Sequence, residues 1–229
     1  MSKYEFLVFD WDGTILDSAA IITHSIEEAC KEMSLAIPDR ERIRHIIGLG
    51  FEDAMMHILP ELDKNHYEIF TKHYRQHVHA RDKELALFAG AADTIRTLHA
   101  QGYSLAIATG KNRATFDKEL AVSGLAQYFH GSRCANETFS KPHPAMLLGL
   151  MEGLGFEPES TLMIGDTTHD LQMAKNANVS AVAVSYGAHP KEELMKLAPL
   201  ACLDDISDLN DWLTKHHEMI LRANDTSLG

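Results

Sequence analysis

The chain has 229 residues, 45% of them hydrophobic and 24% charged, so it is long and apolar enough to bury a core without disulfides. Its formal net charge of −12 at pH 7 argues against a general nucleic-acid-binding protein, because that function needs a basic surface. The three cysteines are scattered, the N-terminus lacks a signal-peptide pattern, and no apolar run approaches the roughly 18 residues of a membrane span. We therefore expect free thiols, a cytoplasmic location and no membrane partner.

Apolar runs along the chain predict the strands of a parallel sheet that is covered on both faces. The expected strands are Tyr4–Asp10, Tyr103–Thr109, Gly131–Ala135, Thr161–Gly165, Ser180–Tyr186 and a weaker one at Ala201–Leu203. Helical patterns lie between them at Ala91–Gln101, from Asn112 to Gly124, at Pro144–Gly153 and at Thr168–Asn176. This alternation predicts a doubly wound parallel α/β fold with a Rossmann-like core.

The stretch from Thr14 to about Leu87 shows no strand pattern and breaks the alternation. A connection between a strand and a helix usually has about 2–6 residues, so this segment is too long to be a loop. Ser18 and Asp39 are suited to cap two helices, and two more helices are expected at about Glu52–Ile58 and Asp63–Asp82. We expect residues 17–85 to form an all-α cap domain that moves as a lid over an α/β core of residues 1–16 and 86–229.

Chemically active residues follow four of the predicted strands. The segments are Asp10-Trp11-Asp12-Gly13-Thr14, Thr109-Gly110-Lys111, Ser140-Lys141-Pro142 and Gly165 to Asp170. Ligands of open α/β sheets bind at the carboxyl ends of the strands, so these side chains should meet at one edge. Asp and Gly are also ordinary turn residues, and for this reason the ordered set carries more weight than any single member.

These motifs resemble those of the haloacid dehalogenase-like superfamily, in the branch with a helical cap after the first strand. Within it, the chain is similar to phosphoglycolate phosphatases and β-phosphoglucomutase-like proteins, from Phe6 to about Tyr186. The resemblance implies an Asp10 nucleophile, an Asp12 general acid/base and a bound Mg²⁺. The implied metal-binding residues are Asp10, Asp12, Asp166 and Asp170, and the implied phosphate-binding residues are Thr109 and Lys141.

The physical chemistry of phosphate esters agrees with these implied roles. A carboxylate attacks a phosphate dianion poorly because both are negative, and a shared Mg²⁺ offsets that repulsion. Attack by Asp10 would give an aspartyl-phosphate, which divides hydrolysis into two easier steps. Asp12 would protonate the leaving alkoxide and later deprotonate water. Gly110 offers a backbone N–H near a helix N-terminus, and Lys141 offers a positive charge to the transferred phosphoryl oxygens.

Two groups of basic residues allow more than one interpretation. Arg44 and the Gly48–Gly50 loop of the cap either contact the substrate beyond its phosphate or belong to a charged helix face and its end. Lys111 and Arg113 either bind substrate at the entrance or merely lie near a helix start. We take Arg44, Gly110 and Lys111 as candidate substrate contacts.

The expected function is a Mg²⁺-dependent phosphatase, monomeric or homodimeric, acting on a small phosphorylated metabolite, with phosphoglycolate the first choice. The alternatives are a β-phosphoglucomutase-like phosphomutase, a haloacid dehalogenase that uses no metal, and a non-enzymatic binding or regulatory protein on the same fold. Asp12 and the pair Asp166 and Asp170 argue against a dehalogenase, because carbon–halogen displacement needs neither. A degenerate enzyme would be expected to lack Asp10, Asp12, Lys141 or Asp166, and all four are present.

Overall fold

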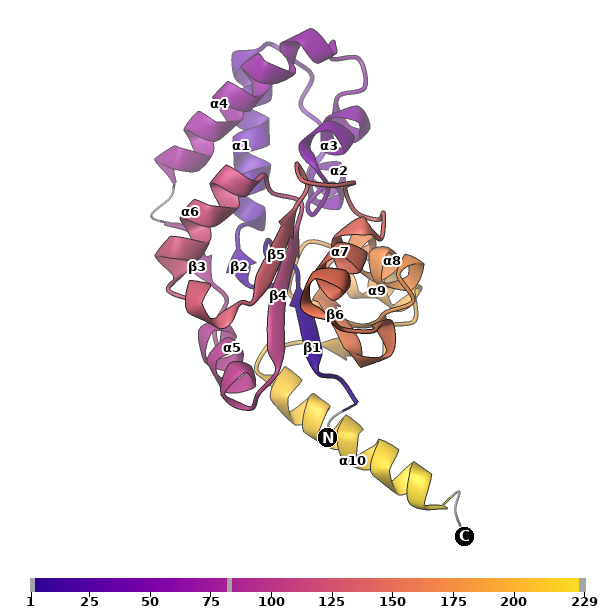
Figure 1. Cartoon of the computed structure of the whole chain (residues 1–229). Coiled ribbons are helices and arrows are strands. Elements are labelled where there is room, and N and C mark those ends of the chain that lie inside the picture. The colour runs from indigo at the N-terminus through magenta and orange to yellow at the C-terminus, as the bar shows by residue number, and fades with distance from the viewer. Residues whose placement is uncertain (1–2, 82–83, 227–229) are drawn as a thin grey trace.

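The computed structural model describes residues 3–81 and 84–226, with side chains described as far as residue 217. Within these ranges six parallel strands form the central sheet, in the order β5-β4-β1-β6-β7-β8 (Figure 1). They are β1 (Phe6–Phe9), β4 (Ser104–Thr109), β5 (Gly131–Cys134), β6 (Thr161–Gly165), β7 (Ser180–Val184) and β8 (Cys202–Leu203). The predicted doubly wound parallel fold is confirmed, and the expected strand ends shift by at most two residues.

Helices cover both faces of this sheet because alternate strand side chains point to opposite faces. Leu7 and Phe9 of β1 pack in one buried cluster, whereas Phe6 and Val8 pack in another. The first face is covered by α5 (Ala91–Ala100), α6 (Arg113–Ser123) and α10 (Asp208–Thr226), and the second by α7 (Ala145–Leu154) and α8 (Thr168–Asn176). The sequence did not predict the short helix α9 (Lys191–Met195) or the long α10. The core also contains two 3₁₀ turns, η3 (Ala126–Tyr128) and η4 (Pro158–Ser160).

The segment between β1 and α5 is folded mainly into helices that lie beyond the carboxyl ends of the strands (Figure 1). These helices are α1 (Ala19–Glu32), α2 (Arg40–His45), α3 (Phe51–Ile58), the 3₁₀ turn η1 (Lys64–His66) and α4 (Tyr67–Ala80). They enclose an apolar cluster of their own, in which Ile43 and Phe70 are fully buried. We call this unit the cap. In the described part of the chain no helix is both long and apolar enough to cross a membrane.

The two connections between cap and core contain a small feature that the sequence pattern did not predict. β2 (Leu16–Asp17) and β3 (Ala86–Leu87) form an antiparallel pair, so the expectation of no strand in this region was wrong for these residues. The domain boundaries that we predicted fall within β2 and immediately before β3. Because the pair ties both connections together, the cap is attached at a single place.

The two predicted helix caps have different outcomes. Asp39 accepts a hydrogen bond from the backbone N–H of Arg42 at 2.8 Å, as expected of a cap. Ser18 precedes α1 but makes no side-chain cap hydrogen bond. Its hydroxyl donates to Oδ1 of Asp12 at 2.5 Å, which is a strong hydrogen bond because the acceptor is a carboxylate. Ser18 therefore belongs to the site at the edge of the sheet.

Candidate active site

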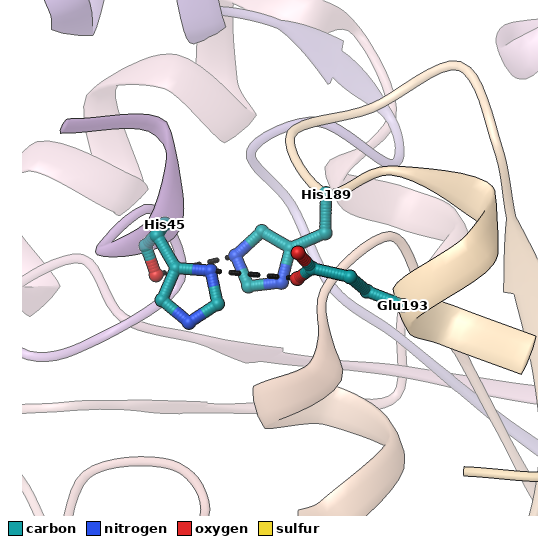
Figure 2. A group of neighbouring side chains, drawn as sticks. All are labelled: His45, His189 and Glu193. Carbon is teal, nitrogen blue, oxygen red and sulfur yellow. Dashed lines mark hydrogen bonds and ion pairs between the residues drawn. The ribbon is translucent and has the colours of Figure 1, made fainter. Parts of the chain in front are cut away.

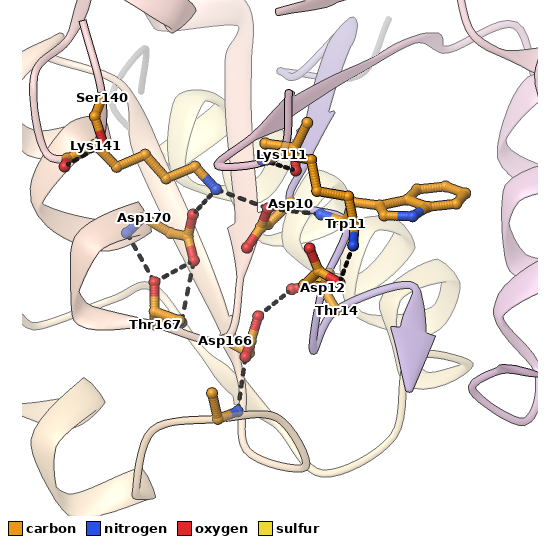
Figure 3. A network of polar contacts seen from close by, with 12 residues as sticks. Asp10, Trp11, Asp12, Thr14, Lys111, Ser140, Lys141, Asp166, Thr167 and Asp170 are labelled. Carbon is orange, nitrogen blue, oxygen red and sulfur yellow. Dashed lines mark hydrogen bonds and ion pairs between the residues drawn. The ribbon is translucent and has the colours of Figure 1, made fainter. Parts of the chain in front are cut away.

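Asp10 follows β1, the central strand, and its side chain is completely buried. Its Oδ1 accepts a hydrogen bond from the backbone N–H of Trp11 at 2.6 Å and lies 2.7 Å from Nζ of Lys141 (Figure 3). Its Oδ2 is buried and has no hydrogen-bond partner among the described residues. One oxygen of Asp10 is therefore held in place while the other is left available.

Asp170 is held by both of its oxygens. Oδ1 lies 2.7 Å from Nζ of Lys141, which places the ammonium between Asp10 and Asp170. Oδ2 accepts hydrogen bonds from the backbone N–H and the hydroxyl of Thr167, at 3.1 and 2.6 Å. Thr167 and Asp170 together form the capping box that begins α8. The local fold of this helix start thus fixes the carboxylate that orients Lys141.

Asp166 follows β6, next to β1, and is also completely buried. Its Oδ1 accepts from the hydroxyl of Thr14 at 2.7 Å and its Oδ2 from the backbone N–H of Ala188 at 2.7 Å. Gly13 has a φ of +81°, and a Cβ at this position would come within 2.1 Å of Asp166 Oδ2. A residue with a side chain at position 13 would displace this carboxylate.

Negative charge is in excess in this buried cluster. Oxygens of Asp10, Asp166 and Asp170 lie within 4.8 Å of one another. Among the described residues, Lys141 forms ion pairs with two of them, Asp10 and Asp170. Burial, followed by the charge of Asp170, raises the pKa of Asp166 to about 7 and raises the pKa of Asp10 well above its usual range. Burial opposes the charged form of Lys141, but Asp10 and Asp170 outweigh it and raise the Lys141 pKa. These three carboxylates have the charge and ligand type to hold a hard divalent cation.

The carboxylate of Asp12 lies in a separate network, outside that group of three (Figure 3). Its Oδ1 accepts from Ser18 and lies 3.0 Å from Nζ of Lys111. Lys111 Nζ also lies 3.0 Å from Oε1 of Glu119, whose Oε2 accepts from the indole N–H of Trp11 at 2.8 Å. The prediction that Asp12 is a metal ligand thus has no support from its side chain, which is placed beside a basic group instead.

Several partners in these networks were missed at the level of sequence. Thr14 belongs to the first motif, but no sequence pattern pairs it with Asp166. Ser18 follows that motif closely and was predicted only as a helix cap. Glu119 gave no signal, since it is one of several charged residues in α6 and becomes distinctive only when that helix packs against Trp11.

Thr109 and Gly110 lie at the end of β4, where the cap approaches the core. Thr109 is buried, and its Oγ1 accepts from the backbone N–H of Lys111 at 3.1 Å. A Cβ on Gly110 would lie only 2.5 Å from the carbonyl oxygens of Gly48 and Leu49, so the cap loop packs directly on this glycine. A Cβ on Gly48 would lie 3.7 Å from the free Oδ2 of Asp10. The Gly48–Gly50 loop thus lies close to Asp10, and its contact with substrate stays a prediction.

Arg44 and Arg113 both have partners within the protein. The guanidinium of Arg44 donates to the backbone carbonyls of Gly187 and Ala188, at 2.8 and 3.2 Å, and so joins the cap to the core. Arg113 pairs with Glu137 at 2.8 Å on the surface. The structure therefore gives Arg44 a role in joining cap and core, and a contact between Arg44 and substrate stays a prediction.

A second contact between cap and core is formed by imidazole rings (Figure 2). The rings of His45 and His189 stack at 4.4 Å, and His189 Nε2 lies 3.2 Å from the His45 carbonyl oxygen. His45 Nδ1 lies 3.7 Å from a carboxylate oxygen of Glu193. Nδ1 of His189 accepts from the backbone N–H of Thr168 at 3.1 Å, and burial lowers the pKa of His189 to about 3. Since both nitrogens of His189 are used, we interpret this group as a contact that closes the cap.

A cavity of about 1200 Å³ separates the cap from the core beside these networks. Asp12, Gly110 and Lys111 line it from the core, and residues of α1, α3 and α4 line it from the cap. The arrangement brings a buried carboxylate with a free oxygen, a second carboxylate beside a lysine, and a partly open cavity to the same edge of the sheet.

Curated relatives match nearly the whole chain. It is 35% identical over 209 residues to "Probable phosphatase IndB" of Dickeya dadantii (strain 3937), covering 89% of this chain and 90% of the relative. It is 31% identical to pyrophosphatase PpaX of Halalkalibacterium halodurans, covering 90% and 94%. It is 30% identical to a phosphoglycolate phosphatase of Colwellia psychrerythraea, covering 91% and 96%.

Solved structures share the fold at lower identity. A hydrolase from Pseudomonas syringae superimposes with a TM-score of 0.84 at 21% identity, covering 92% of this chain and 98% of that one. A protein from Bacteroides vulgatus, provisionally assigned as a β-phosphoglucomutase, gives 0.83 at 17% identity, covering 94% and 90%. The family model of the haloacid dehalogenase-like hydrolases matches residues 7–184, which include every strand-end motif described above. The chain belongs to the haloacid dehalogenase-like hydrolase family.

Proposed function

We propose that this haloacid dehalogenase-like phosphatase hydrolyses the phosphomonoester of a small metabolite through an aspartyl-phosphate formed on Asp10. The observation that carries the proposal is the state of the two Asp10 oxygens. Oδ1 is fixed by Trp11 and Lys141, whereas Oδ2 is buried, unpartnered and close to the cap loop. An unpaired buried carboxylate oxygen is costly, and it is the atom that a nucleophile must keep free.

The residues present fit a bound Mg²⁺. Three buried carboxylates lie close together, and Lys141 pairs with two of them. Burial, followed by the charge of Asp170, raises the pKa values of Asp10 and Asp166. Asp10 and Asp166 would hold the ion together with the backbone carbonyl of Asp12, while Asp170 is occupied by Thr167 and Lys141 and would support them. When bound, the ion would offset the repulsion between Asp10 and the phosphate dianion.

The reaction divides into two displacements at phosphorus. In the first, Oδ2 of Asp10 forms a bond to phosphorus as the bond to the leaving oxygen breaks, and Asp12 gives that oxygen its proton. In the second, Asp12 removes a proton from water, whose oxygen bonds to phosphorus as the bond to Asp10 breaks. Lys141 balances charge on the transferred oxygens, and the Thr109 hydroxyl and Gly110 N–H complete the phosphate site.

Phosphate release from a panel of phosphorylated compounds tests this proposal. The panel contains p-nitrophenyl phosphate, phosphoglycolate and inorganic pyrophosphate, the last because one relative is named a pyrophosphatase. We expect Mg²⁺-dependent release by the wild-type protein and none by Asp10→Asn, with the circular dichroism spectrum unchanged. Asp12→Ala should retain a slow first step, since general acid/base catalysis contributes about 10²–10⁴-fold.

Two results would overturn the proposal. Hydrolysis that survives Asp10→Asn would remove the nucleophile. Transfer of the phosphoryl group to a second hydroxyl of the substrate, with no release to water, would instead identify a phosphomutase.

A further inference from the structure

The cap contributes an apolar wall to the cavity. Most of these side chains come from α1, α3, α4 and the loop before α3. Two more come from β3 and the residue before it, where the chain returns from the cap to the core. The half-buried members are Ile22, Val78, Leu85 and Leu87, and behind them lie Ile26, Leu49, Met55 and Phe70 of the cap's own buried cluster. None of these side chains donates a hydrogen bond, so a carboxylate or second phosphate placed against them would lose its hydration without compensation.

The basic residues nearest the phosphate site are already paired. Lys111, which lines the cavity beside Gly110, lies 3.0 Å from both Asp12 and Glu119. Arg44 donates to the core carbonyls of residues 187 and 188 and does not line the cavity. The two cations that the sequence suggested for an anionic leaving group are therefore engaged elsewhere.

The charges of the cavity lining do not favour an anionic leaving group either. Arg75 and Lys118 also line the cavity, but both are exposed to solvent, which screens their charge. The lining contains four carboxylates but only three lysine and arginine side chains, together with His79. The carboxylates are Asp12, Glu52, Asp53 and Glu119.

The size of the cavity points the same way. Pockets that enclose drug-sized ligands occupy about 300–1,000 Å³. At about 1200 Å³, this cavity is far larger than the two-carbon leaving group of phosphoglycolate requires. Space of this size with apolar walls suits a bulkier group that is stabilised by burial, at about 25 cal/mol for each Å² of apolar surface.

We propose that the site prefers phosphomonoesters of an uncharged, largely apolar alcohol over esters whose leaving group carries a carboxylate. The inference rests on the proposed function, since it assumes that the phosphate lies at Asp10. It replaces phosphoglycolate as the first choice of substrate with esters of aromatic or branched aliphatic alcohols.

Matched pairs of esters test the preference in the wild-type protein. Phenyl phosphate is compared with 4-carboxyphenyl phosphate, and ethyl phosphate with phosphoglycolate, so that each pair differs mainly in one carboxylate. We expect kcat/KM to be at least tenfold higher for the uncharged member of each pair, and highest for phenyl phosphate. Equal or higher values for the carboxylated members would overturn the inference.

A charge introduced into the apolar wall provides the reciprocal test. Val78→Arg places a cation in the lining from α4 and should shift the ratio of kcat/KM by about tenfold toward 4-carboxyphenyl phosphate. Gln76→Arg adds the same charge to the same helix at an exposed position outside the lining, and should leave the ratio unchanged. Identical shifts in both variants would mean that bulk charge, and not the wall, sets the preference.

The failure of this inference can be told from failure of the proposed function. If Asp10→Asn hydrolyses the esters, the proposed function fails. If hydrolysis depends on Asp10 but shows no preference, only the inference fails. Calorimetric binding of the phenyl pair to Asp10→Asn gives a readout without turnover, and tighter binding of 4-carboxyphenyl phosphate there would also overturn the inference.

Discussion

Arg44 offers a direct test of how the cap is held closed. Its guanidinium makes two hydrogen bonds to core carbonyls, at 2.8 and 3.2 Å, and the residue is otherwise exposed. Each hydrogen bond of this kind contributes about 0.5–1.5 kcal/mol, so Arg44→Ala should weaken the closed state by about 1–3 kcal/mol. That range corresponds to about 5- to 150-fold in the equilibrium between closed and open caps.

The assay compares substrates that make different demands on the cap. Because Arg44 acts on closure and not on the leaving group, Arg44→Ala should lower kcat/KM by a similar factor, about tenfold, for p-nitrophenyl phosphate and for the preferred metabolite ester. Arg42→Ala is the matched control, since Arg42 lies on the same helix but donates to the carbonyl of His57 inside the cap. This control should keep wild-type kinetics.

A loss confined to the metabolite ester would refute this reasoning. It would return Arg44 to the role of a substrate contact, as the sequence first suggested. A similar loss in Arg42→Ala would show that helix α2 is merely being destabilised.

Three further predictions concern the carboxylate cluster. Gly13→Ala should lower kcat by about 10²-fold, because the new Cβ would displace Asp166 by more than 1 Å. Gly102 is the control: it has a similar φ of +90° but open space around it, so Gly102→Ala should lose only stability. Equal kcat values for the two variants would contradict this prediction. Lys141→Met should leave the charges of Asp10 and Asp170 uncompensated, so its melting temperature should fall without Mg²⁺ and recover in part when Mg²⁺ is added. A melting temperature equal to that of the wild-type protein without Mg²⁺ would count against this charge argument. Because the Asp166 pKa is raised to about 7, its contribution to folding stability is complete below about pH 4 and is lost as the pH rises through 7. The Mg²⁺-free protein should thus unfold at lower temperature at pH 8 than at pH 5, with the difference reduced in Asp166→Asn, as followed by circular dichroism.

The sheet could be predicted because its signal is local. Runs such as Phe6–Phe9 and Thr161–Gly165 are buried on both faces and are therefore apolar throughout. β2 and β3 could not be predicted in this way, because two residues show no periodicity and their pairing depends on the cap lying in place. The helix at 208–226 follows a weak last strand, and the sequence pattern predicted no element beyond that strand.

The carboxylates of the site could likewise be placed from strand ends, whereas their partners could not. Asp10 and Asp166 lie where adjacent parallel strands finish, and this follows from topology alone. The direction of a long side chain is decided by competing partners after folding. Arg44 turns to carbonyls near residue 187. Glu119 contacts the neighbouring Lys111 and, across more than a hundred residues of sequence, the indole of Trp11.

The buried indole of Trp11 gives the protein an optical reporter at its site. It is one of two tryptophans, is fully shielded from solvent, packs edge-on against Phe116 at 5.4 Å and donates to Glu119. The other, Trp212, lies on α10 and stacks on His216 at 4.8 Å. A Trp212→Phe protein would carry a single tryptophan, and we expect its emission to shift when water reaches Glu119, its hydrogen-bond partner at the cavity. Opening of the lid, and not only turnover, could then be timed by stopped-flow fluorescence without a label.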